Sequence, residues 1–205
     1  MQKVSVVDYG MSNLDSVARA IEECGGTPVI VGRSQDLEDA TRIVLPGVGA
    51  FGDGMRNIRE RGIDRVLRDQ VVEKGIPLLG ICLGMQLLAT TGYEGGATEG
   101  LGLIDGEVRR LERDAPATRI PHVGWNQVDF VRESPLFAGI RSGGDFYFVH
   151  SYHFVCSDDK DVLATTPYCG AFVSVVSKGY IWGVQFHPEK SQRLGHQLLR
   201  NFISL

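Results

Sequence analysis

The chain has 205 residues, of which 43% are hydrophobic and 22% charged, a composition that excludes a disordered or fibrous protein and predicts one globular domain over residues 1–205. Its formal net charge of −4 argues against nucleic acid or an anionic membrane surface as a partner. The sequence opens without a signal-peptide pattern and no apolar run reaches membrane-spanning length, so we expect a cytoplasmic protein.

The first half of the sequence alternates strand-like runs with stretches of helical periodicity. Short β-rich runs predict strands at residues 4–9, 28–32, 42–46 and 76–82. The helices predicted between them are one from Leu14 to the Gly25–Gly26 pair, a short polar one from Ser34, and one long helix over residues 55–71. This alternation is typical of parallel strands joined by crossover helices.

The second half changes to strand-like runs in quick succession, which favours antiparallel pairing. These runs cover residues 102–111, 122–131, 146–154, 161–166 and 172–186. Apolar residues at helical spacing, Leu194, Leu198, Leu199 and Phe202, then predict a closing amphipathic helix. The predicted fold class is α/β: a flavodoxin-like three-layer sandwich with a mostly parallel central sheet and additional antiparallel strands in the second half.

The sharpest local signal is Cys82, which follows a buried-type strand and has Gly80 and Gly84 at minus two and plus two. A tight strand-to-helix turn holds its central residue in a strained conformation and needs glycine on both sides, as in a nucleophile elbow. A sulfur at a helix N-terminus also favours the reactive thiolate form. Cys82 is therefore the candidate nucleophile; the alternative is a small core residue, as cysteine often is.

The other cysteines, Cys24, Cys156 and Cys169, have neither CxxC nor zinc-like spacing with Cys82. We therefore expect no disulfide and no metal site in this chain.

A cysteine nucleophile needs a base, and His187 is the best placed of the five histidines. It ends a strand-like run and precedes Pro188 and Glu189, so the strand stops there. In an extended His-Pro-Glu segment, residues 187 and 189 point to the same side, and the carboxylate can orient the imidazole. Cys82, His187 and Glu189 are the predicted catalytic triad, although His-Pro-Glu without Cys82 is more often a surface turn.

The third element is a glycine-rich loop, residues 46–54, directly after the third predicted strand. Such a loop offers backbone N–H groups for a developing oxyanion or for phosphate. It lacks the Gly-Lys-Ser/Thr ending of a P-loop and the GxGxxG of a dinucleotide site, so no nucleotide cofactor is expected. By itself the loop is equally a structural turn.

Together these residues resemble the class I, triad-type glutamine amidotransferases, whose hallmarks are a GxCxGxQ elbow and a distant His-Pro-Glu. Within that class the chain is most similar to the glutaminase subunits of imidazole glycerol phosphate synthase. The matching segments run from end to end in the same order: DYGMSNLDSV, LPGVGAFGDGM, GICLGMQLL, EGLGLIDGEV, PHVGWNQV, FYFVHSYHF and GVQFHPEKSQ.

The resemblance implies that Cys82 attacks the side-chain amide of glutamine while His187, oriented by Glu189, moves the protons. It implies no cofactor. The remaining roles implied by the resemblance are an oxyanion hole at Gly47, Val48, Gly49 and Leu83, with one peptide unit that must first reorient, and glutamine binding by Gln86, Glu94, Ser151 and Tyr152. From the residues alone, these last four are ordinary helix and strand positions.

A glutaminase core uses nearly all of the 205 residues, so the ammonia acceptor must lie on another protein. The resemblance implies a heterodimer with a (βα)8-barrel cyclase subunit, which uses the ammonia to make imidazole glycerol phosphate and aminoimidazole carboxamide ribonucleotide in histidine biosynthesis. The residues expected at that interface are Pro121, His122, Trp125, Asn126, Tyr147 and Lys190. From composition alone, residues 121–126 are equally a buried aromatic strand.

The chain departs from the resembled subunits at Ser12 and Asp15, where those subunits usually carry Gly and His. A paralogous glutaminase subunit would show such differences while supplying ammonia to a different synthase, such as one that amidates a surface-polysaccharide sugar. A stand-alone cysteine hydrolase on the same fold is disfavoured, because it needs no glutamine pocket around Gln86. A non-catalytic regulatory subunit is disfavoured because the triad is intact.

Overall fold

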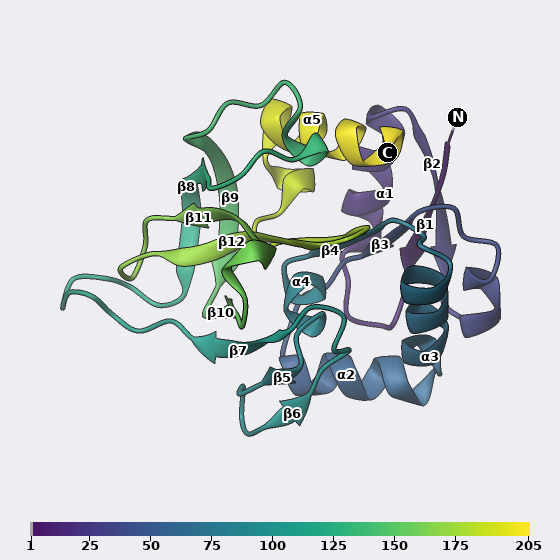
Figure 1. The fold of residues 1–205 in the computed structure, drawn as a ribbon, viewed down its shortest axis with the longest axis horizontal. Helices are drawn as coiled ribbons and strands as arrows, with labels where there is room; N and C mark the ends of the chain where they lie inside the picture. The colour runs from purple at the N-terminus through teal and green to yellow at the C-terminus, as the bar shows by residue number, and fades with distance from the viewer. Residues whose placement is uncertain (1) are drawn as a thin grey trace.

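The computed structural model describes residues 2–205, built on a central parallel sheet (Figure 1). Five parallel strands form its core, in the spatial order β2 (Gly26–Val31), β1 (Gln2–Val7), β3 (Ile43–Leu45), β4 (Leu78–Ile81) and β13 (Ile181–Val184). Most residues of these strands are buried, as β-branched and leucine side chains are in a sheet covered on both faces. The parallel strands predicted from the first half are therefore confirmed.

Antiparallel strands extend the sheet beyond β13. In spatial order these are β12 (Phe172–Lys178), β10 (Tyr152–Cys156), β7 (Gly106–Arg110), β5 (Thr91–Gly92) and β6 (Thr98–Glu99), of which only the β7–β5 pair is parallel. A branch of the sheet runs from β12 through β11 (Val162–Thr166) and β8 (His122–Phe130) to β9 (Gly144–His150). The antiparallel pairing predicted for the second half is confirmed for most of its strands, but the run over residues 172–186 is two strands, and the second of them, β13, pairs parallel with β4.

Helices cover both faces of the parallel strands (Figure 1). On one face lie α1 (Leu14–Glu23) and α5 (Gln192–Ser204), whose apolar sides join one hydrophobic core. On the other lie α2 (Phe51–Glu60), α3 (Ile63–Arg68) and α4 (Leu83–Leu87), which join a second core. Two cores separated by a sheet make the predicted three-layer α/β sandwich.

The prediction of one long helix over residues 55–71 is wrong, because the structure has two helices there, α2 and α3. Gly62 adopts φ +64°, a left-handed conformation that ends α2 and starts α3. A π-helical turn, Asp69–Glu73, then follows α3. The apolar periodicity survives the break because Ile58, Ile63 and Leu67 all reach the same core.

The run predicted as one strand over residues 146–154 is two strands, which separate at Ser151. β9 pairs with β8, whereas β10 pairs with β12 and β7. Short 3-10 turns complete the structure at Ser34–Leu37, Pro135–Phe137, Asp159–Asp161 and Pro188–Lys190. The change of partner at Ser151 leaves residues 149–152 beside the carboxyl ends of the parallel strands, where the candidate site lies.

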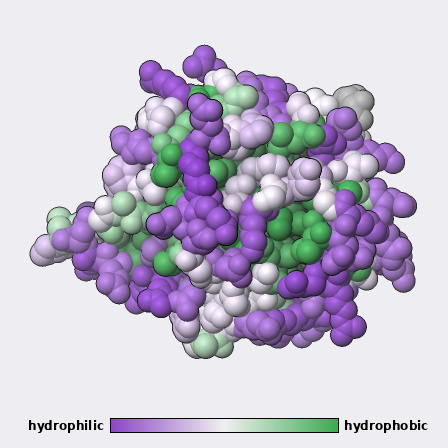
Figure 2. All heavy atoms as spheres, viewed as in Figure 1, coloured by the Kyte–Doolittle hydropathy of each residue, from purple (hydrophilic) through white to green (hydrophobic). Residues whose placement is uncertain are grey.

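Hydrophilic side chains cover most of the face shown in Figure 2, and apolar side chains gather in a few patches near its middle. Within residues 2–205, no helix combines the length and the apolar character needed to cross a bilayer.

Candidate active site

The candidate site forms where three neighbouring parallel strands end. β3 leads into the glycine-rich loop, β4 into Cys82, and β13 into the segment that carries His187. Because the register pairs Leu45 with Gly80 and Ile81 with Val184, these three exits lie at one edge of the sheet. This is the edge at which open α/β sheets bind their ligands.

Cys82 occupies a strained turn between β4 and α4, with φ 54° and ψ −109°. Its backbone N–H donates to Val184 O at 2.8 Å, which anchors the turn to β13. A Cβ on Gly80 would lie 2.7 Å from Gly84 O, and one on Gly84 would lie 1.7 Å from Leu45 O. Both flanking glycines are therefore required by close backbone contacts, and the geometry predicted for an elbow is present.

His187 and Glu189 are in direct contact: His187 Nδ1 lies 2.8 Å from Glu189 Oε1, and both side chains are almost completely buried. The predicted reason for this contact is wrong. Residues 188–190 form a 3-10 turn rather than an extended segment. The turn brings the Glu189 side chain to the His187 ring. A hydrogen bond from the backbone N–H of His187 to Tyr147 O holds the turn against β9.

The electrostatics of this group favour an ion pair. Burial by itself lowers the pKa of His187, but the neighbouring Cys82 sulfur and the hydrogen-bonded Glu189 carboxylate outweigh burial and raise the pKa to about 10. At neutral pH the imidazole is therefore protonated, and an imidazolium beside a cysteine sulfur stabilises the nucleophilic thiolate.

A cavity of about 350 Å³ opens over Cys82 and His187. Its lining contains all of the residues expected to bind glutamine or the oxyanion except Gly47, namely Val48, Gly49, Leu83, Gln86, Glu94, Ser151 and Tyr152. Residues from six separate stretches of sequence thus meet at one hollow. The volume accommodates a single small molecule of amino-acid size.

Two of the lining side chains, Glu94 and Gln86, are fixed by hydrogen bonds to the protein, and each has an oxygen that can accept a hydrogen bond from a ligand. Glu94 Oε2 accepts from the Phe51 backbone N–H at 2.8 Å, at the start of α2. Gln86 Nε2 donates to Tyr152 O at 2.9 Å and to Gln185 Oε1 at 3.0 Å. The remaining oxygen of each side chain is an acceptor that suits an ammonium group in the cavity.

The backbone donors expected at the oxyanion hole are engaged elsewhere in this structure. Val48 N–H donates to Met11 O at 2.8 Å, and Leu83 N–H donates to Gly47 O at 3.4 Å. Ser12 Oγ lies 3.4 Å from Pro46 O, so the loop after β1 holds the glycine-rich loop at two points. A peptide rotation at residues 47–49 would be needed to turn Val48 N–H toward the cavity.

The two departures from the resembled pattern lie against the site. Ser12 contacts the glycine-rich loop, and Asp15 lines a small cavity whose wall also includes Glu189. Residues 11–15 therefore lie against both the glycine-rich loop and the segment that carries Glu189.

The residues expected at the partner interface fall into two groups. Three of them are exposed: Trp125, at 48%, Pro121 and Lys190. Asn126 and Tyr147 are half-buried. The Tyr147 ring makes an edge contact with the Trp125 ring. His122 is different: its side chain is 3% exposed and stacks on Tyr168. In this structure His122 has no surface with which to contact a partner directly, because alternation along β8 turns it inward.

His122 instead belongs to a buried hydrogen-bonded chain. Asn126 Oδ1 accepts from Gln127 N–H, so Asn126 Nδ2 faces and donates to His122 Nε2 at 3.2 Å. His122 Nδ1 then donates to His150 Nε2 at 3.0 Å, and His150 Nδ1 donates to Tyr152 O at 2.8 Å. Burial lowers the pKa of His122 to about 4 and that of His150 to about 3, so both rings are neutral at physiological pH.

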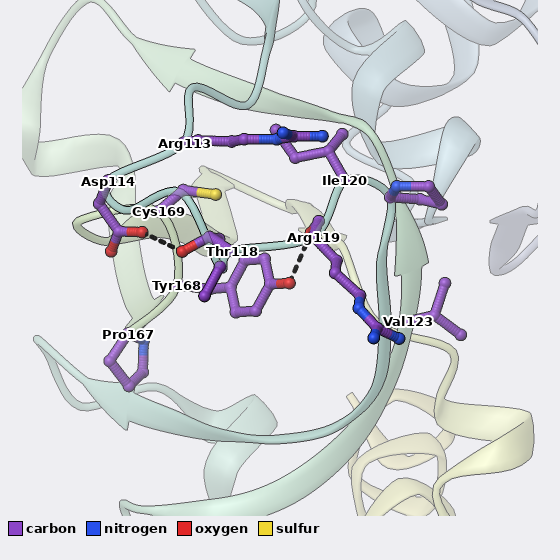
Figure 3. A pocket seen from close by; sticks show the side chains of 11 residues that line it. Arg113, Asp114, Thr118, Arg119, Ile120, Val123, Pro167, Tyr168 and Cys169 are labelled. Atoms are coloured by element: carbon purple, nitrogen blue, oxygen red, sulfur yellow. Dashed lines mark hydrogen bonds between the residues drawn. The ribbon is translucent and has the colours of Figure 1, made fainter.

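A larger hollow, of about 810 Å³, lies beside the one over Cys82. It is formed between the segments 113–121 and 167–169, with Tyr168 in its wall and the Arg113 and Arg119 side chains on either side (Figure 3). The Tyr168 hydroxyl donates to Arg119 O at 2.6 Å. Pro121 lines this hollow and also the cavity over Cys82, so the two adjoin at that residue.

Two residues of the site were not identified from the sequence. Gln185 is fully buried between Cys82 and Gln86. Tyr9 is also fully buried, and a Cβ on Gly47 would lie only 2.1 Å from its hydroxyl oxygen. A signal existed for Gln185, since it is a polar residue in the apolar run before His187, but nothing in the run shows what it contacts.

Comparison with known proteins agrees with this geometry. The family model for glutamine amidotransferase class-I matches residues 5–205. A protein of Campylobacter jejuni (strain RM1221) named imidazole glycerol phosphate synthase subunit HisH 1 is 46% identical over 202 residues, which cover 98% of this chain and all of that protein. The subunit HisH of Moorella thermoacetica is 47% identical over 206 residues, covering 100% of this chain and 96% of that protein.

Solved structures share the fold. The structure of PurLQS from Thermotoga maritima matches with a TM-score of 0.78 at 23% identity, covering 99% of this chain and 98% of that one. A crystal structure described as a glutamine amidotransferase matches with a TM-score of 0.77 at 20% identity, covering 98% and 99%. From the family match and the full-length relatives together, the chain belongs to the class I glutamine amidotransferases, in the family of HisH subunits of imidazole glycerol phosphate synthase.

Proposed function

We propose that this chain hydrolyses glutamine to glutamate and ammonia and passes the ammonia to a separate cyclase subunit that makes imidazole glycerol phosphate. The observation that carries the proposal is that Cys82 and His187 line one cavity of amino-acid size, with Glu189 hydrogen-bonded to His187. Membership of the HisH family supports the acceptor reaction.

The chemistry follows from the positions of the three side chains. The Cys82 thiolate attacks the side-chain amide carbon of glutamine, and the carbonyl oxygen becomes an oxyanion. His187 then gives its proton to the leaving nitrogen, so ammonia departs and a γ-glutamyl thioester remains. In the second half His187 takes a proton from water, the hydroxide attacks the thioester, and glutamate is released. Glu189 holds the imidazole in orientation and stabilises its charge throughout.

Activity of this site requires the oxyanion hole to be assembled. In the chain alone Val48 N–H is bonded to Met11 O, so it cannot stabilise the oxyanion. We infer that binding of the cyclase with its ligand shifts the 47–49 segment, and that the isolated chain is nearly inactive. Full glutaminase activity of the isolated chain would overturn this part of the proposal.

We assign the partner to the face formed by the outer side of β8 and the mouth of the cavity. Val123, Trp125 and Val48 are exposed there, and the exposed Lys190 directly follows the triad carboxylate in sequence. Apolar and aromatic side chains clustered around a site mouth suit a protein partner. The partner implied by the family resemblance is a (βα)8-barrel cyclase, and ammonia passing directly into it avoids loss to solvent.

A second acceptor has one observation in its favour. Ser12 and Asp15 differ from the residues usual in the histidine-pathway subunits, and both lie against the site. A paralogous chain would keep the glutaminase chemistry and deliver ammonia to another synthase, for example one that amidates a sugar.

The deciding experiment measures imidazole glycerol phosphate formed by this chain mixed with a histidine-pathway cyclase subunit from the same source. We expect product from glutamine with the wild type, and product only from free ammonia with Cys82→Ala. Glutamate without imidazole product would retain the glutaminase and redirect the search to another synthase. No glutamate at all, with the partner bound, would overturn the proposed function.

A further inference from the structure

A buried glutamine, Gln185, lies directly after β13 and makes no contact with solvent. Its backbone N–H donates to Ser174 O at 2.9 Å, which fixes the main chain at this point. Its side-chain amide lies between Cys82 and Gln86: Nε2 is 3.7 Å from Cys82 Sγ, and Oε1 is 3.0 Å from Gln86 Nε2. A buried amide is stable only when its donors and acceptors are used, so these two neighbours set its orientation.

The orientation of both amides is determined by one backbone group. Tyr152 O can only accept, so the Gln86 atom that faces it at 2.9 Å is the nitrogen. The second hydrogen of that nitrogen needs an acceptor, which makes the facing atom of Gln185 the oxygen. Gln185 therefore presents its N–H group to the sulfur of Cys82.

Two protein groups bond to the Cys82 sulfur within residues 2–205, and they favour opposite protonation states. The Val149 carbonyl, 3.9 Å away, accepts from the thiol S–H. The Gln185 amide donates, and donors favour the thiolate. The titratable groups that face the sulfur are His187 and the Tyr9 phenol. Tyr9 is buried, and both its burial and the negative charge of Cys82 raise the pKa of Tyr9.

We propose that Gln185 is a positioning residue for the glutaminase reaction with two effects: its N–H stabilises the Cys82 thiolate, and its oxygen turns the Gln86 oxygen toward the substrate ammonium group. The inference rests on the proposed function, because it takes Cys82 as the nucleophile and glutamine as the substrate. Removing the Gln185 amide leaves the sulfur with the Val149 carbonyl and His187 as its neighbours, and it frees the Gln86 amide to rotate.

The test uses Gln185→Met, which keeps the length of the side chain and removes both polar atoms. The matched control is Gln70→Met, because Gln70 is equally buried but lies in the turn after α3, away from the site. The first readout is the pH profile of Cys82 alkylation by iodoacetamide in the chain bound to its cyclase. The second is kcat and KM for glutamine in the same complex.

We expect Gln185→Met to move the alkylation midpoint upward by about one pH unit, and so to slow alkylation about tenfold at pH values well below the wild-type midpoint. We also expect kcat to fall by a similar factor and KM to rise several-fold, with Gln70→Met unchanged in all three. An alkylation profile and a KM like those of the wild type would overturn the inference. A shared loss in both variants would do the same, because it would show a general effect of a buried polar deletion.

A measurement on the wild type covers the case in which Gln185→Met does not fold. We expect the side-chain amide resonances of Gln185 to shift as the Cys82 thiol titrates, and to lose that shift in Cys82→Ala. Resonances that do not respond to the thiol would overturn the inference. Both alkylation and resonance shifts report on the sulfur without glutamine turnover, so failure of the proposed function would be seen separately, as absence of glutamate.

Discussion

At the scale of single residues, the site is a set of buried polar groups that determine one another's protonation. Glu189 is almost completely buried and hydrogen-bonds to His187, so its carboxylate favours the charged form of the imidazole. Cys82 and Glu189 together raise the His187 pKa from 6.5 to about 10, so their interactions with His187 stabilise the folded chain fully below pH 6.5. The stabilisation is then lost as the pH rises through about 10.

The first prediction concerns this pair. Glu189→Gln removes a negative charge and leaves burial, which by itself lowers the pKa of His187. We therefore expect the His187 pKa to fall below about 10, as measured by nuclear magnetic resonance of the imidazole Cε1–H against pH. Glu23→Gln, beside the half-buried His196, is the control and leaves His187 unchanged. A His187 titration identical in wild type and Glu189→Gln would refute the prediction.

The second prediction concerns the hold on the oxyanion loop. Ser12→Ala removes the hydroxyl contact with Pro46 O and leaves only the Val48–Met11 bond on that side. The loop then rotates more readily, and we expect glutaminase activity of the isolated chain to rise about two- to fivefold, the effect of losing one hydrogen bond of ~0.5–1 kcal/mol. Thr41→Ala, which removes a hydroxyl bond to Lys3 O near the start of β3, is the control. Equal glutaminase rates of the isolated wild type, Ser12→Ala and Thr41→Ala chains would show that Ser12 does not restrain the loop.

At the scale of elements, the elbow depends on how closely α4 approaches the ends of β3 and β4. Gly84 leaves no room for a side chain, since its Cβ would lie 1.7 Å from the Leu45 carbonyl oxygen. The contact is between two backbones, so neither side can move by rotating a side chain. Helix α4 is only five residues long, and its position is set by this packing rather than by its own stability.

The third prediction follows. Gly84→Ala is expected to lower the free energy of unfolding by more than ~3 kcal/mol, because backbone must shift to relieve the overlap. Gly25→Ala is the control: it has φ +86° but nothing within 4 Å, so only backbone strain of about 1 kcal/mol is expected. Urea denaturation measures both. The same experiment tests the single domain predicted over residues 1–205, for which one cooperative transition is expected.

At the scale of the whole molecule, the two helical layers bury the apolar faces of the parallel strands, while β8 presents side chains outward near the cavity mouth. Val123 and Trp125 are exposed on one side of β8, and His122 and Val128 are buried on the other. The same strand therefore contributes to the core and to the proposed partner face, as strand alternation allows.

The fourth prediction separates these two roles. Trp125→Ala should weaken binding of the cyclase by at least about tenfold, since a central aromatic at an interface commonly contributes ~2 kcal/mol or more. The free energy of unfolding of the chain should stay within ~0.5 kcal/mol. Tyr180→Ala is the control, because Tyr180 is 61% exposed and lies in the turn before β13. That turn is at the opposite end of β13 from the candidate site. Calorimetry of the complex measures binding, and unchanged affinity for Trp125→Ala would move the interface elsewhere.

The sequence by itself determined the fold class and the identities of the triad candidates. Helical and strand periodicities are local, so α1, α5 and four of the five parallel strands could be predicted within a few residues, whereas the parallel pairing of β13 could not. The elbow is also local, because its two glycines and its cysteine lie within five residues. The close contact of Gly84 with Leu45 explains why residue 84 must be glycine, but the elbow can be recognised without knowing that contact.

Only the tertiary structure decided how distant segments meet. The bond of Val48 to Met11 joins loops 37 residues apart, and the contact of Gln185 with Cys82 spans 103 residues. The burial of His122 depends on Tyr168 from another loop, and the break at Gly62 depends on packing that lets α2 and α3 share one core. Such features arise from close packing and from the need to pair buried polar groups, neither of which leaves a periodic signal along the chain.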